Sequence, residues 1–266
     1  MIAQLNNQYF TTLSQPLVQY LLHLADTTLI LGHRNSEWCG HGPILEQDIA
    51  ISNIALDLIG QARMFYQYAA EKAQQPGATD ITEDSLAYLR DGIDFKNLLL
   101  AEQQNGDWAI TILRQFLYSS WQYLVYEQMQ QGTDVQMAAI AEKAIKETTY
   151  HIKWSGEWVI RLGDGTEESH KRMLHAIEVL WPFTGEMFTP VDFEKEGIQQ
   201  GWAVDVASLQ QPWLQRIQQA FDEAGLSVPQ SQWQQTGGKK GVHTELLGFL
   251  LAEMQHLQRA YPGSEW

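Results

Sequence analysis

The sequence predicts an all-α protein. Apolar residues recur at helical spacing over long windows of the 266-residue chain, whereas few segments alternate with the two-residue period of a strand. Hydrophobic residues make up 44% of the chain, which is enough for a substantial core. We therefore expect one helical domain over residues 1–266.

Start and stop residues divide the chain into helices. Ser14, with Pro16 in the first turn, opens the first long helix, Asn105 caps the third, and Asp134 opens the fourth. The long helices are expected at about 14–34, 43–75, 106–131 and 135–162. Shorter or later helices are expected at about 82–90, 95–103, 167–187, 208–224 and 243–260.

The four long helices form two hairpins joined by a longer connection, which is the plan of a ferritin-like four-helix bundle. The core bundle should span about residues 14–162, and the added peripheral and C-terminal helices should cover about 166–260.

Charge and composition exclude several classes of protein. Seventeen basic residues against 32 acidic ones give a formal net charge of -15, so most of the surface would repel a nucleic acid backbone. A single cysteine excludes an internal disulfide framework. No leader pattern and no apolar run of 18 residues occurs, so we expect a cytoplasmic protein without a membrane partner.

Ferritin-like bundles provide a specific test for a metal site. A di-iron centre takes one Glu from each of two helices and a Glu-x-x-His motif from each of the other two. In the second helix, Leu58 and Gln61 occupy the two positions of that motif. In the fourth helix, His151 is preceded by Thr148 three positions earlier, although Glu147 at i−4 could still share the face of His151.

The other two helices do not supply the missing ligands. The third helix has no carboxylate over residues 108–126, and the first offers only Asp26. A missing carboxylate leaves metal charge uncompensated in a low-dielectric core. We therefore predict no metal in this chain, with vestigial ligand positions at Leu58, Gln61, Thr148 and His151 and with His151 as a hydrogen-bonded core residue. Two literal Glu-x-x-His matches lie outside the four long helices, at Glu167 with His170 and at Glu253 with His256.

A polar stripe on the second helix should face the same region. Asn53, Asp57 and Gln61 are spaced i, i+4 and i+8, so they share one helix face. We expect them to form a self-satisfied interior network, with Arg114 or Lys146 as the neutralising cation. A bound ion is the alternative interpretation.

A glycine-rich segment, TGGKKGVHTELLG at residues 236–248, precedes the last helix. It lacks the spacing of a phosphate-binding P-loop and no strand precedes it. Lys239 and Lys240 oppose the dipole of the following helix, which suggests an anionic neighbour. That neighbour could be an acidic partner surface or a phosphorylated ligand, and a solvated loop is the simpler alternative.

Several long stretches resemble a known family over about residues 17–266. The chain is similar to the structural, non-catalytic subunits of the ring 1,2-phenylacetyl-CoA epoxidases, which are bacterial multicomponent oxygenases. The stretches that carry the resemblance are SEWCGHGP, ALDLIGQAR, FKNLLLAEQQNGDWA, KAIKETTYH, RLGDGT and TGGKKGVHTELLGFLLAEMQHLQR.

The resemblance implies a role inside a larger enzyme. In that family, such a subunit pairs with a ferritin-like catalytic subunit that carries the di-iron centre. A small accessory subunit and a reductase with FAD and an iron–sulfur centre complete the system. The complex uses dioxygen and NADPH to epoxidise the ring of phenylacetyl-CoA in aerobic phenylacetate degradation. The chain itself would then hold no cofactor and no catalytic residue.

The resemblance also implies that coenzyme A lies near the subunit interface. Two segments could form an edge of that substrate site, the polar loop around residues 94–97 and the loop after the sixth helical segment. The residues are Asp94, Phe95, Lys96, Asn97, Val191, Asp192 and Phe193. A carboxylate–metal enzyme in its own right and a stand-alone helical binding protein remain the rival hypotheses.

Overall fold

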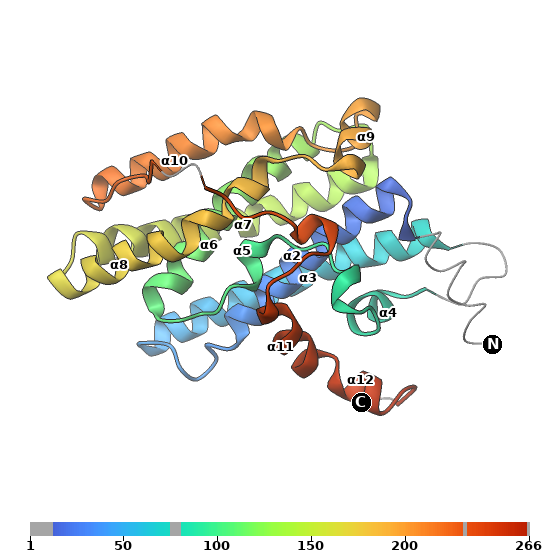
Figure 1. Cartoon of the computed structure of the whole chain (residues 1–266), viewed down its shortest axis with the longest axis horizontal. Helices are drawn as coiled ribbons and strands as arrows, with labels where there is room; N and C mark the ends of the chain where they lie inside the picture. Colours follow the sequence, from blue (N-terminus) through green and yellow to red (C-terminus); the bar gives the residue numbers. More distant parts are fainter. Residues whose placement is uncertain (1–12, 75–80, 231–232, 265–266) are drawn as a thin grey trace.

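A computed structural model describes residues 13–74, 81–230 and 233–264 of the chain. These residues form helices joined by turns and loops, with no strand among them (Figure 1). The all-α class predicted from the apolar spacing is therefore confirmed. None of the helices in this part of the chain combines the length and the apolar character of a membrane span.

Four long helices form two hairpins. α2 (Pro16–Ser36) packs along α3 (Leu45–Ala73), and α6 (Trp108–Met129) packs along α7 (Val135–Gly163). α3 also lies beside α7, so the hairpins close into a bundle around a buried apolar interior (Figure 1). This is the ferritin-like plan expected from the sequence, and the expected bounds of these helices hold to about two residues.

The caps of α6 and α7 explain where these helices begin. The Asp134 carboxylate accepts a hydrogen bond from the backbone N–H of Met137, as expected for an N-cap. Asp107 caps α6 by accepting from the N–H of Ile110, so the assignment of this cap to Asn105 was wrong. The Asn105 side chain instead donates to the carbonyl oxygen of Arg34 at 2.7 Å.

The connection between the hairpins is mostly extended. It contains α4 (Glu83–Tyr88), the short 3-10 turn η1 (Gly92–Asp94) and α5 (Leu99–Glu102), so the helix expected over 95–103 was wrong for its first half. Tertiary hydrogen bonds replace the helical ones there. The N–H of Lys96 donates to Asp26 at 2.7 Å, and the N–H of Leu98 donates to the hydroxyl of Thr27 at 3.2 Å.

The remaining helices pack around the bundle. They are α8 (Glu167–Leu180), α9 (Asp192–Gln200), α10 (Gln210–Glu223), α11 (Glu245–Met254) and α12 (His256–Ala260). The helix expected over 167–187 ends early, because Pro182 cannot continue it and 3-10 turns follow, η2 (Trp181–Phe183) and η3 (Gly185–Phe188). Two further 3-10 turns are η4 (Val206–Leu209) and η5 (Gly238–Lys240).

α9 was not expected as a helix. Its first turn is completed by the carboxylate of Glu194, which accepts from the N–H of Val191 at 2.9 Å. The helix ends at Gly201, whose φ of 80° is accessible to glycine at low cost.

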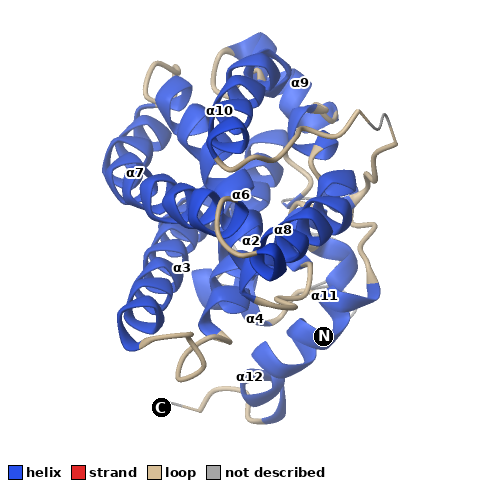
Figure 2. Cartoon of the chain, turned by 90° about the vertical axis from the view of Figure 1, so that its left-hand side faces the viewer, coloured by secondary structure: helices blue, strands red, loops and turns tan. Residues whose placement is uncertain are grey.

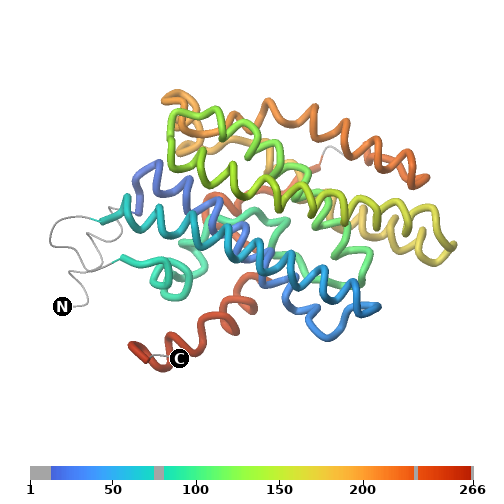
Figure 3. The backbone as a smooth tube through the Cα atoms, turned by 180° about the vertical axis from the view of Figure 1, so that it is seen from behind, coloured from blue at the N-terminus to red at the C-terminus, as the bar shows by residue number. Residues whose placement is uncertain are grey.

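The later helices leave one side of the bundle open. α8 and α10 pack against α6 and α7, and α9 packs against α2. Figure 2 shows α3 and α7 at the edge of the molecule, and Figure 3 shows them side by side on the face toward the viewer. None of the other described helices crosses the outer faces of α3 and α7 in these views.

Candidate functional site

A cluster of buried polar side chains occupies the middle of the bundle, where a di-iron site would lie. Gln61 of α3 and Gln122 of α6 form its centre, because the Gln122 amide donates to Oε1 of Gln61 at 2.9 Å. The Tyr126 hydroxyl donates to the same oxygen at 3.0 Å, and Oγ1 of Thr148 lies 3.5 Å from Oε1 of Gln122. All four side chains are buried, so three helices share one hydrogen-bonded network.

The tyrosines of this network are neutral hydrogen-bonding groups. The Gln122 amide also reaches the hydroxyls of Tyr118 at 3.2 Å and Tyr126 at 3.0 Å. Burial raises the pKa of both phenols well above the usual value near 10. Both hydroxyls therefore keep their protons at neutral pH, which suits hydrogen bonds among neutral groups and does not suit cation binding.

Two acidic groups lie where α3 meets α7. The Gln61 amide donates to Oε2 of Glu147 at 2.9 Å, and Oδ2 of Asp57 lies 3.0 Å from Nε2 of His151. His151 is fully buried, so it is a hydrogen-bonded core residue, and its Nδ1 has no hydrogen-bond partner within the described part of the chain. Asp57 points toward α7 because it lies about 100° around α3 from the Leu58 position.

The expected interior stripe on α3 is only partly present. Asn53 and Lys146 are both exposed, so neither belongs to the interior network. Arg114 is buried, but its guanidinium donates to the carbonyl oxygen of Gln103 and to Oδ1 of Asn105. The expectation that Arg114 or Lys146 neutralises this stripe was therefore wrong.

The residues present do not fit a di-iron centre. The motif positions of α3 hold an alkyl group and an amide, in Leu58 and Gln61, and the Glu position of α7 holds the hydroxyl of Thr148. The facing side chain of α6 is a third neutral group, the amide of Gln122. Within the described residues, no group of three or more His, Cys, Asp or Glu side chains is placed to hold a metal ion. Neutral donors that already bind one another leave metal charge uncompensated, so we derive no chemistry through iron in this chain.

The segment around residues 94–97 is largely internal. Phe95 and Asn97 are fully buried, whereas Asp94 and Lys96 are half-buried. Phe95 and Asn97 of the expected polar loop therefore lie inside the protein and not at its surface. The guanidinium of Arg90 lies over the Phe95 ring, with its Cζ atom 4.4 Å from the ring centroid.

A buried ion pair fixes this segment to the bundle. Asp26 and Arg90 are both almost fully buried, and the guanidinium of Arg90 donates to both carboxylate oxygens of Asp26. The same carboxylate accepts from the Tyr66 hydroxyl at 2.5 Å and from the N–H of Lys96 at 2.7 Å. All of its hydrogen bonds thus serve the fold, so Asp26 is not a spare carboxylate for a metal.

The glycine-rich segment has its anionic neighbour inside the protein. Lys239 is 1% exposed, and its Nζ lies 2.9 and 3.0 Å from the two carboxylate oxygens of Glu194. Neither an external anion at Lys239 nor the solvated-loop alternative therefore holds for this residue. Lys240 is exposed and stays available at the surface.

The close approach of this segment to residues 93–97 requires glycine. A Cβ on Gly238 would lie 2.2 Å from the carbonyl oxygen of Asn97, and one on Gly241 would lie 2.1 Å from that of Ile93. Gly241 also has a φ of 79°. Glycine therefore lets two backbone segments lie against each other here.

The third candidate segment, residues 191–193, is also mostly internal. Val191 and Phe193 are buried and Asp192 is exposed. Because α9 begins at Asp192, the expectation of a loop over these residues was wrong at Asp192 and Phe193.

His23 lies where the three candidate segments converge. Its Nδ1 lies 2.8 Å from the carbonyl oxygen of Lys96, and its ring lies 6.2 Å from that of Phe193. Burial, with the nearby charge of Lys239, lowers the pKa of His23 to about 4, so the ring is neutral at pH 7. Segments far apart in sequence are thus brought together, mostly through buried side chains.

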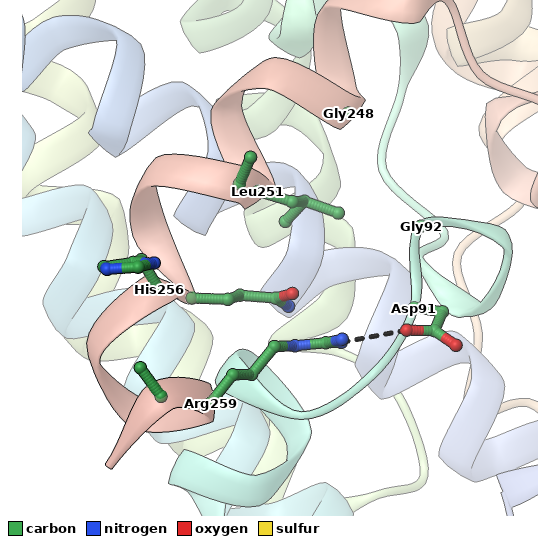
Figure 4. Close-up of a pocket in the computed structure, with 9 residues that line it drawn as sticks. Asp91, Gly92, Gly248, Leu251, His256 and Arg259 are labelled. Atoms are coloured by element: carbon green, nitrogen blue, oxygen red, sulfur yellow. Dashed lines mark hydrogen bonds and ion pairs between the residues drawn. The ribbon is translucent and has the colours of Figure 1, made fainter.

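An open pocket is lined by Asp91 and Gly92 and by residues of α11 and α12. It has a volume of about 520 Å³ and lies between α11–α12 and the start of η1 (Figure 4). Arg259 crosses it and donates to Asp91 and to the carbonyl oxygen of Arg90, each at 2.9 Å. None of the site residues predicted from the sequence lines this pocket.

Comparison with known proteins places the chain in a family. The family model for the phenylacetic acid catabolic protein matches residues 3–266. The chain is 48% identical over 250 residues to the C-type subunit of the 1,2-phenylacetyl-CoA epoxidase of Escherichia coli (strain K12), and the match covers 94% of this chain and 99% of that protein. The resemblance noted in the sequence is thereby confirmed, and the chain belongs to the phenylacetic acid catabolic protein family.

Proposed function

We propose that this chain is the structural, C-type subunit of a ring 1,2-phenylacetyl-CoA epoxidase that acts in aerobic phenylacetate degradation. It supports a separate ferritin-like subunit that carries the di-iron centre, and it has no catalytic centre of its own. A small accessory subunit and a reductase with FAD and an iron–sulfur centre, which takes electrons from NADPH, complete the cytoplasmic system. The 48% identity to the C-type subunit of the Escherichia coli epoxidase supports this assignment.

One observation carries the non-catalytic role, namely the neutral network at the centre of the bundle. Gln61, Gln122 and Tyr126 form hydrogen bonds to one another where a catalytic bundle would place carboxylates around iron. Leu58, Gln61, Thr148 and His151 are on this proposal the vestigial ligand positions. Neutral groups that hydrogen-bond to one another avoid the unfavourable free energy of burying charged metal ligands. A hydrogen-bonded network of this kind also makes the interior rigid, which suits a supporting subunit.

The chain also contributes an edge of the coenzyme A site in this proposal. Lys96 is half-buried beside the glycine-rich segment, and Lys240 is exposed on that segment. These two ammonium groups suit the phosphates of coenzyme A. Phe95, Asn97 and Val191 are buried, so in this proposal they do not contact the ligand. They would position the exposed residues of this edge by packing against them.

Asp94, Asp192 and Phe193 belong to the same edge in the proposal. Asp94 is half-buried, Asp192 is exposed, and Phe193 is a buried residue of the first turn of α9. The two carboxylates favour contacts to hydroxyl or amide groups of the ligand over contacts to its phosphates, because like charges repel.

Co-expression of the chain with the other polypeptides of the complex is expected to yield a stable hetero-oligomer. An obligate interface of this kind buries well over about 1,200 Å², so the species should survive dilution and gel filtration. Native mass spectrometry of the eluted peak would give its composition, with the chain expressed alone as the control. Purification of the chain apart from every co-expressed polypeptide would contradict a subunit role.

A further inference from the structure

His243 lies at the end of the glycine-rich segment and forms hydrogen bonds through both of its ring nitrogens. Its Nδ1 lies 2.9 Å from Oε2 of Glu102, and its Nε2 lies 3.0 Å from the carbonyl oxygen of Phe95. A neutral imidazole carries one N–H, so it can donate to only one of these two oxygens. The geometry therefore favours the imidazolium form, in which both ring nitrogens donate.

Glu102 of α5 is the acceptor in its contact with His243. Its carboxylate is 0% exposed, and it accepts from the side-chain amide of Asn97 at 2.9 Å. It also accepts from the N–H and the hydroxyl of Thr244, at 2.7 and 2.8 Å. Donors thus approach both of its oxygens, as suits a carboxylate, which only accepts. The proton between Glu102 and Nδ1 therefore belongs to the imidazole ring.

The surroundings of His243 favour its charged form. Burial alone would lower its pKa, but the hydrogen bond to Glu102, the charge of that carboxylate and the carbonyl oxygen of Phe95 raise the pKa above the usual value of about 6.5. The carboxylate of Asp26 in α2 acts in the same direction. The two hydrogen bonds of the imidazolium are therefore complete at low pH, and one of them is lost as the pH rises through this raised pKa.

Two cations lie around the same contacts. The guanidinium of Arg34 donates to the carbonyl oxygen of Glu102 at 2.9 Å and to that of Leu246 at 3.4 Å. Nζ of Lys96 lies 3.5 Å from the place that a Cβ on Gly241 would occupy. The ammonium group of Lys96 is therefore beside the glycine-rich segment, next to the residue that follows Lys240.

His243 fixes the peptide group that precedes Lys96. The carbonyl oxygen of this peptide belongs to Phe95 and accepts from His243, while its N–H belongs to Lys96 and donates to Asp26 at 2.7 Å. Both polar groups of one peptide are thus held, one from the glycine-rich segment and one from α2. The same histidine follows Lys240 by three residues, so it connects the backbones that carry the two lysines.

We infer that His243, as an imidazolium, is a positioning residue of the coenzyme A edge, which holds Lys96 and Lys240 in place for the phosphates of the ligand. This inference rests on the proposed function and adds a residue that acts without touching the ligand, since the side chain of His243 is only 6% exposed. Loss of the charge on His243 releases one of its two contacts, so the affinity for the ligand falls as the pH rises.

The first measurement uses the full, unchanged chain in isolation. Nitrogen NMR of labelled histidine rings distinguishes an imidazolium, which has two N–H groups, from a neutral ring, which has one. We expect the pKa of His243 to lie above the usual histidine value of about 6.5. A pKa at or below that value would overturn the inference, whatever the complex does.

The second measurement uses the assembled complex. In His243→Gln, KM for phenylacetyl-CoA should rise by about fivefold to tenfold, the effect of one hydrogen bond to a charged group, while kcat changes by less than about twofold. His256→Gln makes the same change at an exposed position of α12 and should leave both constants within about twofold. Misfolding of His243→Gln would lower kcat by loss of active complex and would not raise KM.

The pH dependence separates His243 from Lys96. KM of the unchanged complex should rise as the pH increases through the pKa of His243, whereas KM of His243→Gln should already be high and should lack that step. Burial also lowers the pKa of Lys96, so its loss of charge adds a separate rise. That second rise should remain in His243→Gln, because Lys96 is unchanged there.

Two further results would count against the inference in distinguishable ways. An active complex in which His243→Gln leaves KM unchanged, or keeps the first pH step, would overturn the positioning role while the proposed function stands. A complex that contains the unchanged chain and does not turn over phenylacetyl-CoA would overturn the proposed function and the positioning role together.

Discussion

Replacing Lys239 with methionine is expected to lower the free energy of unfolding by about 3–5 kcal/mol. The side chains of Lys239 and Glu194 are 1% and 0% exposed, so the change leaves a carboxylate buried without its cation. Glu194 also completes the first turn of α9, and Lys239 donates to the carbonyl oxygen of Thr189 at 3.3 Å. Denaturant unfolding of the isolated chain, followed by far-ultraviolet circular dichroism, measures the effect.

The neighbouring lysine provides a matched control. Lys240→Met removes the same charge from an exposed position, so its effect should stay within about 0.5 kcal/mol. Removing both buried charges, in Lys239→Met with Glu194→Gln, should recover much of the lost stability, because no unpaired charge remains and the amide oxygen can still accept from the N–H of Val191. Equal effects of Lys239→Met and Lys240→Met would contradict a structural role for the buried pair.

Replacing Arg90 with leucine should have an effect of the same size, about 3–5 kcal/mol. Asp26 would stay buried, with the Tyr66 hydroxyl and the N–H of Lys96 as its remaining donors. The extended segment at residues 95–98 depends on this carboxylate, so its amide protons should also exchange faster. Unfolding and hydrogen exchange of the isolated chain measure the two consequences.

The control for Arg90 is an exposed arginine–aspartate pair nearby. Arg259→Leu breaks the contact between Arg259 and Asp91, whose side chains are 41% and 75% exposed, so its cost should not exceed about 1 kcal/mol. A loss from Arg90→Leu no larger than that from Arg259→Leu would argue against the buried pair as the anchor of this segment.

The sequence was sufficient to predict the bundle but not its connections. Long helices repeat an apolar spacing many times, so α2, α3, α6 and α7 could be placed to about two residues. The segment 95–98 was expected to begin a helix, yet the N–H groups of Lys96 and Leu98 bind Asp26 and Thr27, which lie about 70 residues earlier in the chain. α9 is short and depends on Glu194 and Gly201, a signal too local to detect by periodicity.

The sequence predicted part of the central polar cluster but not its hydrogen bonds. Helical spacing led to the prediction of vestigial ligand positions at Leu58, Gln61 and Thr148, and that assignment stays a prediction. The pairing of Gln61 with Gln122 could not be predicted, because it depends on the rotation and stagger of α3 against α6. A weak signal was present in α6, where Tyr118, Gln122 and Tyr126 share one face at i, i+4 and i+8.

Lys239 and Lys240 also show that long-range contacts could not be predicted from the sequence. Opposition to the helix dipole correctly indicated that an anion lies near Lys239, but its partner Glu194 is 45 residues away in the sequence. Nothing in the sequence distinguishes these adjacent lysines, but Lys239 is buried and Lys240 is exposed.

The iron content of the isolated chain tests the central claim most directly. The chain would be loaded with ferrous iron without oxygen, passed through a desalting column and analysed for bound metal. The neutral network of Gln61, Gln122 and Thr148 predicts no stoichiometric iron. About two tightly bound irons per chain, lost in Glu147→Gln with His151→Gln, would contradict the account.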